Sequence, residues 1–251
     1  MAAGRPPLAT LMLIRSVLFT VLMFISILPW SIVIVIGRLG GYEVAYALTV
    51  MWMRGAFWLL QHLCRLNYRV EGSEHIPARK AVVLLKHSSA YETLAQFLLF
   101  PGYQCWVVKR ELLWAPFLGW AVAAIRPIAI DRGAGQRAVA QVLAKGKVRL
   151  DEGHWVMVFP EGTRVPPGET RRYGLSGVLL AQESGRLLLP VAHNAGDYWP
   201  RRGWRKGPGT VTFRIGLPLD PAGRDPRQVN AELQAWIEAQ VAELRESGNP
   251  G

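Results

Sequence analysis

The feature that most constrains the fold is an uncharged stretch near the start of the chain. From Ser16 to Gly37 the sequence holds no Asp, Glu, Lys or Arg over 22 positions. Roughly 20 apolar residues are enough for a helix to cross the hydrocarbon core of a bilayer. A cleaved signal peptide has a shorter apolar run with a small-residue cleavage site behind it, and a core helix is rarely so long. The stretch therefore predicts a membrane-associated helix, and Pro29 in its middle leaves a kinked, re-entrant segment open as the alternative to a spanning one.

A second apolar segment, from Val44 to Leu63, is interrupted only by Arg54. Together the two segments predict an N-terminal membrane anchor made of helices over residues 1–65. Arginines flank both segments on either side, so the positive-inside rule does not orient the anchor. A formal net charge of +11 with ten tryptophans is typical of chains that meet a membrane surface, acidic substrates or nucleic acid. No nucleic-acid recognition module accompanies the charge, so we expect a phospholipid membrane as partner and no nucleic acid.

Beyond residue 65 the chain alternates between short apolar runs, typical of buried strands, and segments with helical spacing. We expect strands at Leu66–Glu71, Ala81–Leu85, Gln104–Val108, Ile125–Ile130, His154–Phe159, Leu187–Ala192 and Thr210–Ile215. Helices are expected at Thr93–Phe100, Gln136–Leu150, Leu175–Ser184 and after the Asp225-Pro226 pair, which is typical of a helix start. The alternation predicts a single α/β domain over residues 66–251. The two cysteines and the scattered histidines lack the spacing of a metal site, so we expect no metal.

The most informative polar stretch is Lys86-His87-Ser88-Ser89-Ala90-Tyr91-Glu92, which follows the apolar run Ala81–Leu85. Open α/β sheets bind their ligands at the carboxyl ends of strands. A serine N-cap would put Glu92 in the first turn of the next helix, where its carboxylate can fix the His87 tautomer and leave the other ring nitrogen as a general base. The same residues also form a capping box, in which Glu92 only satisfies backbone N–H groups. These residues alone do not decide between the two roles.

A second polar turn, Phe159-Pro160-Glu161-Gly162-Thr163-Arg164, ends the strand expected at 154–159. Gly162 permits a tight turn, and Arg164 is suited to bind a phosphate bidentately beside backbone N–H groups. Glu161 carries the wrong charge for a phosphate, so its expected role is to hold Arg164 or to accept from a substrate hydroxyl. Alone, a surface turn of this composition is more often structural.

These motifs occur in an order that resembles a known family. The His87-x-x-x-x-Glu92 pattern is followed by Ile128-Ala129-Ile130-Asp131-Arg132, by the turn at 159–164 and by Leu189-Pro190-Val191-Ala192. In this order they resemble the four sequence blocks of the glycerolipid acyltransferases of the lysophosphatidic acid acyltransferase (PlsC-like) family. The resemblance implies a single acyltransferase domain with a central mixed sheet flanked by helices, preceded by the hydrophobic helical anchor.

The resemblance also implies a reaction and a role for each motif. His87 would be the general base and Glu92 its orienting partner. The acceptor's phosphate would be surrounded by Lys109, Arg132, Glu161, Gly162, Thr163 and Arg164. A fatty acyl group would pass from an acyl-CoA or acyl carrier protein thioester to a lysophospholipid hydroxyl, without a covalent enzyme intermediate. The commonest acceptor in the family is 1-acyl-sn-glycerol 3-phosphate, which gives phosphatidic acid. No cofactor is implied, and the expected location is a bacterial-type inner membrane, with the catalytic domain on the cytoplasmic side.

The chain departs from the family pattern at two positions. Glu92 stands where aspartate is commonest, and Val165 follows Arg164 where serine is common. The second departure bears on the acceptor's head group more than on the reaction, so another lysophospholipid or a lyso-aminolipid is an alternative acceptor. An acyl-thioester hydrolase and a non-catalytic membrane-binding module are further alternatives. Arg132 and Arg164 argue against the hydrolase, which needs no phosphate site, and no Gly-x-Ser-x-Gly elbow is present to supply a serine nucleophile.

Three further features each keep more than one interpretation. Trp114, Phe117 and Trp120 either line an acyl tunnel or lie on a membrane-facing or core helix. The basic, Trp-containing segment at 201–206 is either a contact with an anionic interface or a solvated loop. His193 either touches substrate or is a hydrogen-bonded structural histidine.

Overall fold

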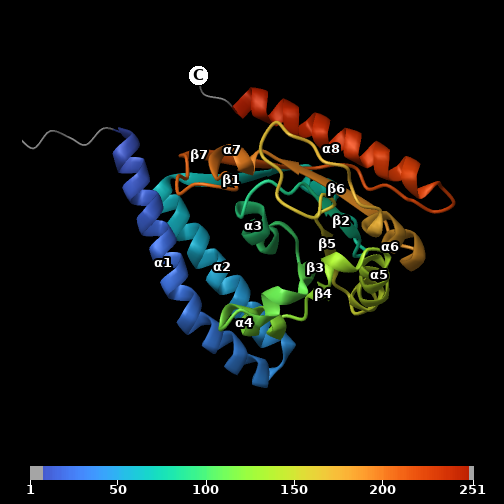
Figure 1. Cartoon of the computed structure of the whole chain (residues 1–251), viewed down its shortest axis with the longest axis horizontal. Helices are drawn as coiled ribbons and strands as arrows, with labels where there is room; N and C mark the ends of the chain where they lie inside the picture. Colours follow the sequence, from blue (N-terminus) through green and yellow to red (C-terminus); the bar gives the residue numbers. More distant parts are fainter. Residues whose placement is uncertain (1–7, 249–251) are drawn as a thin grey trace, which may run out of the picture.

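The computed structural model describes residues 8–248 (Figure 1). The described helices are α1 (Leu8–Gly37), α2 (Tyr42–Cys64), α3 (Tyr91–Leu99), α4 (Leu118–Ala124), α5 (Gln136–Asp151), α6 (Ser176–Ser184), α7 (Ala195–Tyr198) and α8 (Pro226–Gly248). The strands are β1 (Leu66–Glu71), β2 (Val82–Leu85), β3 (Gln104–Lys109), β4 (Ile128–Ile130), β5 (Trp155–Val158), β6 (Leu188–His193) and β7 (Gly209–Ile215). The expected alternation of strands and helices is thus confirmed.

The described strands form one mixed sheet in the order β1-β7-β6-β2-β5-β3-β4. Strands β6, β2, β5, β3 and β4 run parallel, whereas β7 is antiparallel to β6 and pairs in parallel with β1. The central β2 has β6 on one side and β5 on the other. The residues that follow β2 therefore emerge in the middle of the carboxyl edge of the parallel strands, which is where open sheets of this kind place their ligands.

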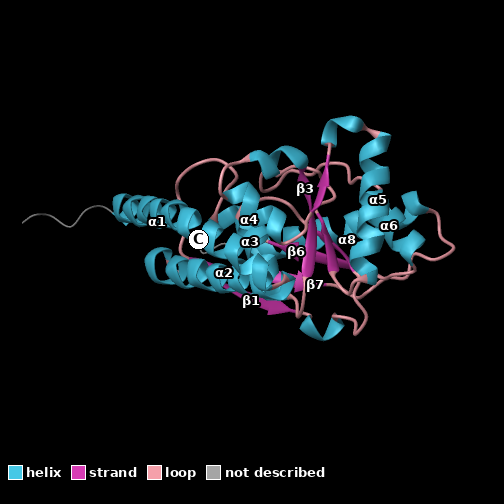
Figure 2. Ribbon diagram, turned by 90° about the horizontal axis from the view of Figure 1, so that it is seen from below, coloured by secondary structure: helices cyan, strands magenta, loops and turns pink. Residues whose placement is uncertain are grey.

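Two layers of helices cover the two faces of the sheet (Figure 2). Successive residues of β2 point to opposite faces, as the pleat requires. Val83 and Leu85 join the core beneath α1, α2 and α3, whereas Val82 and Leu84 join the core beneath α5, α6 and α8. All four β2 residues are fully buried, which explains why the strand is a continuous aliphatic run and not an alternating one.

The two apolar segments form an antiparallel helical hairpin whose turn lies at residues 38–41. Helix α1 continues through Pro29, so the turn between α1 and α2, and not the proline, reverses the chain. By length and composition α1 is the one described helix that could cross a membrane. Its buried face contacts the rest of the molecule near both ends: the Ser16 hydroxyl accepts from the Lys206 N–H at 2.9 Å, and Ile34 packs with Ala121.

Element boundaries differ from expectation at two places. The strand expected at 125–130 begins only at Ile128, because Ile125 ends α4 and Arg126 then adopts a left-handed conformation with φ of 55°. The helix expected from Thr93 begins two residues earlier at Tyr91, because the Ser89 hydroxyl accepts from the Tyr91 N–H at 3.0 Å. This earlier start brings Glu92 into the first turn as expected, but the N-cap is Ala90 and not a serine, with Ser89 one position before it.

Candidate active site

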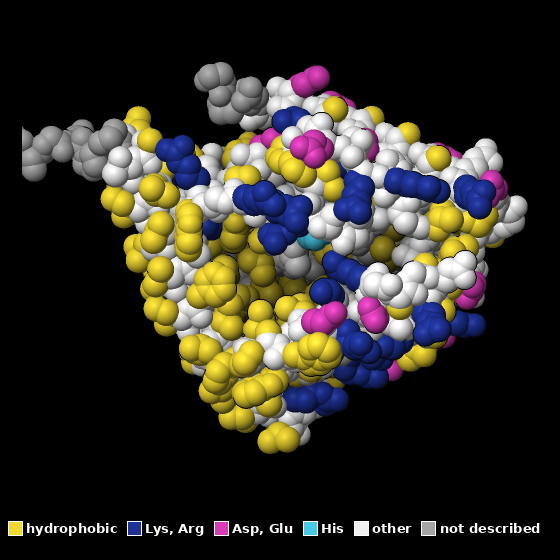
Figure 3. Space-filling model, in the orientation of Figure 1, with side chains coloured by type: hydrophobic (Ala, Val, Ile, Leu, Met, Phe, Trp, Pro, Cys, Tyr) yellow, Lys and Arg dark blue, Asp and Glu magenta, His cyan; other side chains and the backbone are white. Residues whose placement is uncertain are grey.

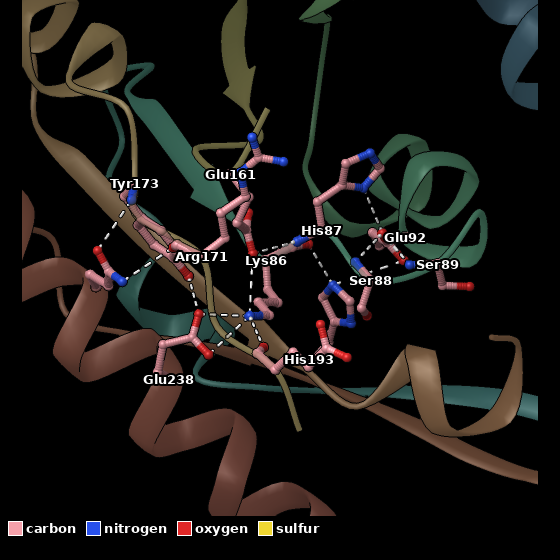
Figure 4. A network of polar contacts seen from close by, with 12 residues as sticks. Lys86, His87, Ser88, Ser89, Glu92, Glu161, Arg171, Tyr173, His193 and Glu238 are labelled. Atoms are coloured by element: carbon pink, nitrogen blue, oxygen red, sulfur yellow. Dashed lines mark hydrogen bonds and ion pairs between the residues drawn. The ribbon is translucent and has the colours of Figure 1, made fainter. Parts of the chain in front are cut away.

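His87 and Glu92 meet at the junction of β2 and α3. The His87 Nδ1 lies 2.8 Å from the Glu92 Oε1 (Figure 4). Burial by itself raises the pKa of the Glu92 carboxyl, but the neighbouring rings of His193 and His87 and the Ser89 N–H outweigh it and hold the pKa below its ordinary value. The carboxylate is therefore ionised and only accepts, so Nδ1 carries the proton and Nε2 is the basic nitrogen. This is the tautomer that a general base requires.

The same carboxylate also caps the helix. Its Oε1 accepts from the Ser88 N–H at 3.0 Å and from the Ser89 N–H at 2.8 Å, in addition to the His87 ring. The Glu92 side chain is fully buried, so its position is fixed by these donors and not by solvent. The geometry is thus compatible with both roles that the sequence left open, because one oxygen accepts from the backbone before α3 and from the imidazole together.

The exposed side of the His87 ring is the side that can act on a substrate. Its side chain is 13% exposed and stacks on Phe159 with ring centroids 4.1 Å apart. Among residues 8–248 no hydrogen bond engages Nε2, whereas Nδ1 is engaged by Glu92. The ring is therefore held on one nitrogen and on one face, and its basic nitrogen is left for a ligand.

His193 lies behind this pair and has a different character. Its Nε2–H donates to the Lys86 carbonyl at 2.7 Å, and its Nδ1 accepts from the Ala195 N–H at 3.1 Å. Burial lowers its pKa, and the ring has almost no exposed surface. Both nitrogens are thus used within the protein, which favours the structural interpretation of His193 over contact with substrate.

Lys86 points to the opposite side of β2 from His87 and enters a buried ionic network. Its ammonium donates to the two oxygens of Glu238 on α8 at 2.6 and 2.9 Å and lies 3.3 Å from the Glu161 Oε1. Glu238 also accepts from the Tyr173 hydroxyl at 2.8 Å (Figure 4). The Glu161 Oε1 accepts in turn from the His87 N–H at 3.3 Å. Glu161 therefore binds Lys86 and the backbone of the catalytic histidine candidate, not Arg164.

A cleft of about 500 Å³ is lined in part by Phe159, the stacking partner of His87, whereas His87 itself is not among the lining residues. Four of the predicted site residues line it: Arg132, Glu161, Gly162 and Thr163. Arg132 is held at the turn because its Nη1 donates to the Gly162 carbonyl at 2.8 Å. Arg171 and Arg172 also line the cleft, and they belong to no motif that would have selected them in advance.

Two of the six residues predicted to surround the acceptor's phosphate lie outside the lining of this cleft. Arg164 is half-buried on the His87 side of the turn, where its carbonyl accepts from the Arg201 side chain at 2.9 Å and the next N–H, of Val165, donates to the His87 carbonyl at 2.8 Å. Lys109 ends β3 with an exposed side chain 3.5 Å from Glu111. The structure thus brings Arg132, Gly162 and Thr163 together and places Arg164 and Lys109 to either side.

The family model described as Acyltransferase matches residues 67–194, which is half of the chain and contains His87, Glu92 and the turn at 159–164. The chain belongs to this acyltransferase family. It is 39% identical over 94% of its length to the 1-acyl-sn-glycerol-3-phosphate acyltransferase of Pseudomonas aeruginosa, of which it covers 94%. It is also 26% identical to the human 1-acyl-sn-glycerol-3-phosphate acyltransferase alpha, over 76% of this chain and 69% of that protein.

The fold of this acyltransferase matches a solved structure along most of its length. The crystal structure of the 1-acyl-sn-glycerophosphate acyltransferase PlsC from Thermotoga maritima superposes with a TM-score of 0.76 at 23% identity, over 93% of this chain and 96% of that one. The expected architecture, a mixed sheet flanked by helices and preceded by an apolar N-terminal helix, is therefore confirmed.

The surface of the acyltransferase divides into an apolar and a basic part. In Figure 3 hydrophobic side chains cover one flank and the adjacent tip, and Lys and Arg side chains gather around a hollow at their border, where a histidine is visible. The apolar part includes exposed side chains of α1 together with Trp114, which is 67% exposed, and Trp120, which is 52% exposed. These exposures favour a membrane-facing role for the two tryptophans over an acyl tunnel.

Proposed function

We propose that the protein is a membrane-bound 1-acylglycerol-3-phosphate O-acyltransferase, which transfers a fatty acyl group from an acyl-CoA or acyl carrier protein thioester to 1-acyl-sn-glycerol 3-phosphate. The observation that carries the proposal is a His87 ring held by Glu92 on one nitrogen, with no described residue bonded to its other nitrogen, stacked on the Phe159 ring that lines an arginine-bearing cleft. The names of the relatives support the same acceptor.

The proposed reaction proceeds in one active site with both substrates bound. His87 Nε2 takes the proton of the acceptor hydroxyl as its oxygen attacks the thioester carbonyl. The tetrahedral intermediate then collapses, the C–S bond breaks, and the thiolate leaves with the proton from Nε2. The charge that develops on the imidazole lies 2.8 Å from the buried Glu92 carboxylate, which stabilises it in surroundings of low dielectric. No residue is acylated in this scheme.

The acceptor's phosphate is proposed to bind at the turn after β5. Gly162 has a φ of 67°, which an L-residue rarely adopts, and the turn exposes Thr163 together with the Arg132 guanidinium. Arg164 and Lys109 are proposed to add positive charge on the two sides of this position. Glu161 has a supporting role in this scheme, because its carboxylate faces Lys86 and not the cleft cations.

The anchor is proposed to lie along the membrane within one leaflet. Between Ser16 and Ile34 the helix axis extends about 27 Å, and the α/β domain contacts α1 near both of these residues. If α1 crossed the bilayer, the attached polar domain would have to enter the hydrocarbon with it. Arg15 and Arg38, at the two ends of the uncharged stretch, would instead both lie at head-group level.

Labelling in sealed inverted vesicles tests this placement. Arg15→Cys and Arg38→Cys variants should both react with an impermeant maleimide from the face that carries the catalytic domain, because both positions lie at one interface. Cys64 and Cys105 are buried and provide a low background. Reaction of the two new cysteines from opposite faces would show that α1 spans the membrane.

The proposed activity is tested by mass-spectrometric assay of the purified protein against a panel of lysophospholipids, with palmitoyl-CoA and palmitoyl carrier protein as donors. We expect phosphatidic acid from 1-acyl-sn-glycerol 3-phosphate, and a loss of about 10²–10⁴-fold in His87→Ala, which is the usual contribution of a general base. Release of free fatty acid without transfer would identify a thioester hydrolase. Preferential acylation of another lysolipid would identify a different acceptor, and unchanged turnover in His87→Ala would contradict the mechanism.

A further inference from the structure

The wall of the cleft that carries Arg171 and Arg172 is built separately from the motif turn. The backbone around these arginines is held by α8: the Gln234 side chain donates to the Arg171 carbonyl and accepts from the Tyr173 N–H, both at 3.2 Å. Asn230 donates to the Tyr173 carbonyl at 3.1 Å. A chain segment without regular secondary structure is thus fixed on both sides of Arg172, so the two arginines are presented at a defined place.

This wall is also fixed relative to the catalytic side. The Gly174 N–H donates to the Pro160 carbonyl at 2.8 Å, which ties the arginine-bearing segment to the turn that begins with Phe159. The Tyr173 side chain is buried and its hydroxyl donates to Glu238, the partner of Lys86 (Figure 4). The two walls of the cleft are therefore parts of one hydrogen-bonded frame.

The charge of the cleft exceeds what a single phosphate needs. Among the described residues that line it there are three arginines and one carboxylate, Glu161, whose Oε1 lies 3.3 Å from the Lys86 ammonium. Ser176, the first residue of α6, also lines the cleft, so the positive end of that helix adds to the field. The volume of about 500 Å³ falls in the range of cofactor-sized sites.

We propose that Arg171 and Arg172 bind the phosphates of the acyl donor, that is, the phosphopantetheine arm and, in coenzyme A, the attached nucleotide. This inference rests on the proposed function, in which the acyl group passes directly between two substrates that are bound together. Such a transfer needs two subsites that bind anionic groups. One binds the acceptor's phosphate at Arg132 and Thr163. The other binds the phosphates of the donor, which are distant from its thioester. The Arg171–Arg172 wall supplies the second, since it opens on the same cleft as Phe159, the stacking partner of His87.

A comparison of two substrates and one binding probe tests the assignment. The double variant Arg171→Ala/Arg172→Ala should weaken the binding of coenzyme A, measured by titration calorimetry, by at least about tenfold, because each arginine can form charge-assisted hydrogen bonds to a phosphate. The KM for palmitoyl-CoA should rise by a similar factor, and the KM for the lysophospholipid and kcat at saturating donor should stay as in the parent. Arg227→Ala is the matched control, because it removes one exposed positive charge from α8 away from the cleft.

The acyl carrier protein donor distinguishes the two sources of the phosphate. An equal rise in the KM for palmitoyl carrier protein supports contact with the phosphopantetheine phosphate, and a rise confined to palmitoyl-CoA supports contact with the nucleotide phosphates. A rise in the lysophospholipid KM alone would assign the arginines to the acceptor and overturn the proposal. Unchanged KM values for both donors would also overturn it. So would a loss of vesicle binding without a change in donor affinity. If the parent protein binds coenzyme A through these arginines but acylates no lysophospholipid, the proposed function fails and the donor site stands.

Discussion

Lys86 and His87 are neighbours at the end of β2, and each meets a buried carboxylate. The Glu92 Oε1 lies 2.8 Å from the His87 ring, and the Glu161 Oε1 lies 3.3 Å from the Lys86 ammonium. Both carboxylate side chains have no exposed surface, yet their pKa values shift in opposite directions. The pKa of Glu92 lies below its ordinary value, whereas burial raises the pKa of Glu161 against the opposing charge of Lys86.

The groups around each carboxylate explain the difference: the His193 ring contributes most to lowering the pKa of Glu92, followed by the His87 ring and the Ser89 N–H. Glu92 receives one ring N–H and two backbone N–H groups, all on Oε1. Glu161 shares the ammonium of Lys86 with Glu238, which lies closer to it, at 2.6 Å. Glu92 thus has two rings and two backbone N–H groups to offset its burial, whereas Glu161 depends mainly on an ammonium that it shares with a closer carboxylate. Glu92 is suited to stand beside a charged imidazole, and Glu161 is suited to hold a backbone in place.

The strongest test of this contrast is to remove the charge of each carboxylate in turn. Glu92→Gln should lower kcat by about 10²-fold or more, because a carboxamide cannot stabilise the imidazolium that forms on His87. Glu161→Gln should lower kcat by less than about tenfold, since its amide oxygen can still accept from the His87 N–H and Lys86 keeps Glu238 as its partner. Steady-state assays at saturating substrates measure both factors.

The opposite ranking would reverse the assignment of the two residues. A larger loss in Glu161→Gln than in Glu92→Gln would mean that Glu161 takes part in the chemistry and that Glu92 is only a helix cap. Glu92→Asp adds a second check, because it restores the commonest acid of the family pattern while keeping the charge. We expect it to retain more activity than Glu92→Gln.

The part of the site that could be predicted from the sequence is the part made by local structure. Glu92 lies five positions after His87, and the Ser88-Ser89 turn between them, with Ser89 bonded to the first helical N–H, brings the two together. The turn at 159–164 is local in the same sense, because its geometry depends on the positive φ of Gly162 within the turn itself. The strands were likewise found from their apolar runs, although β4 is shorter than its run because Arg126 turns the chain.

The remainder depends on contacts between distant segments. Lys86 and Glu238 are 152 positions apart, and Arg171 and Gln234 are 63 positions apart. No spacing in the sequence predicts either pair. The order of the sheet, in which β1 pairs with β7, has the same origin. For α8 the sequence predicts only a helix after Asp225-Pro226, whereas in the structure its polar residues Gln234 and Glu238 fix the far wall of the cleft.

A smaller effect is expected at the far end of the Lys86 network. Glu238→Ala should lower the free energy of unfolding by about 2–4 kcal/mol, less than the full cost of breaking a buried ion pair because Glu161 remains beside the ammonium. The Tyr173 hydroxyl also loses its acceptor in this variant, which loosens the segment that carries Arg171. Urea unfolding at constant pH measures the change.

Glu232→Ala, on the same helix but with a side chain 51% exposed and paired with Arg224, is the matched control and should cost no more than about 1 kcal/mol. Equal costs in the two variants would show that the buried network adds nothing beyond a surface pair. The site would then owe its rigidity to the Glu92 side alone.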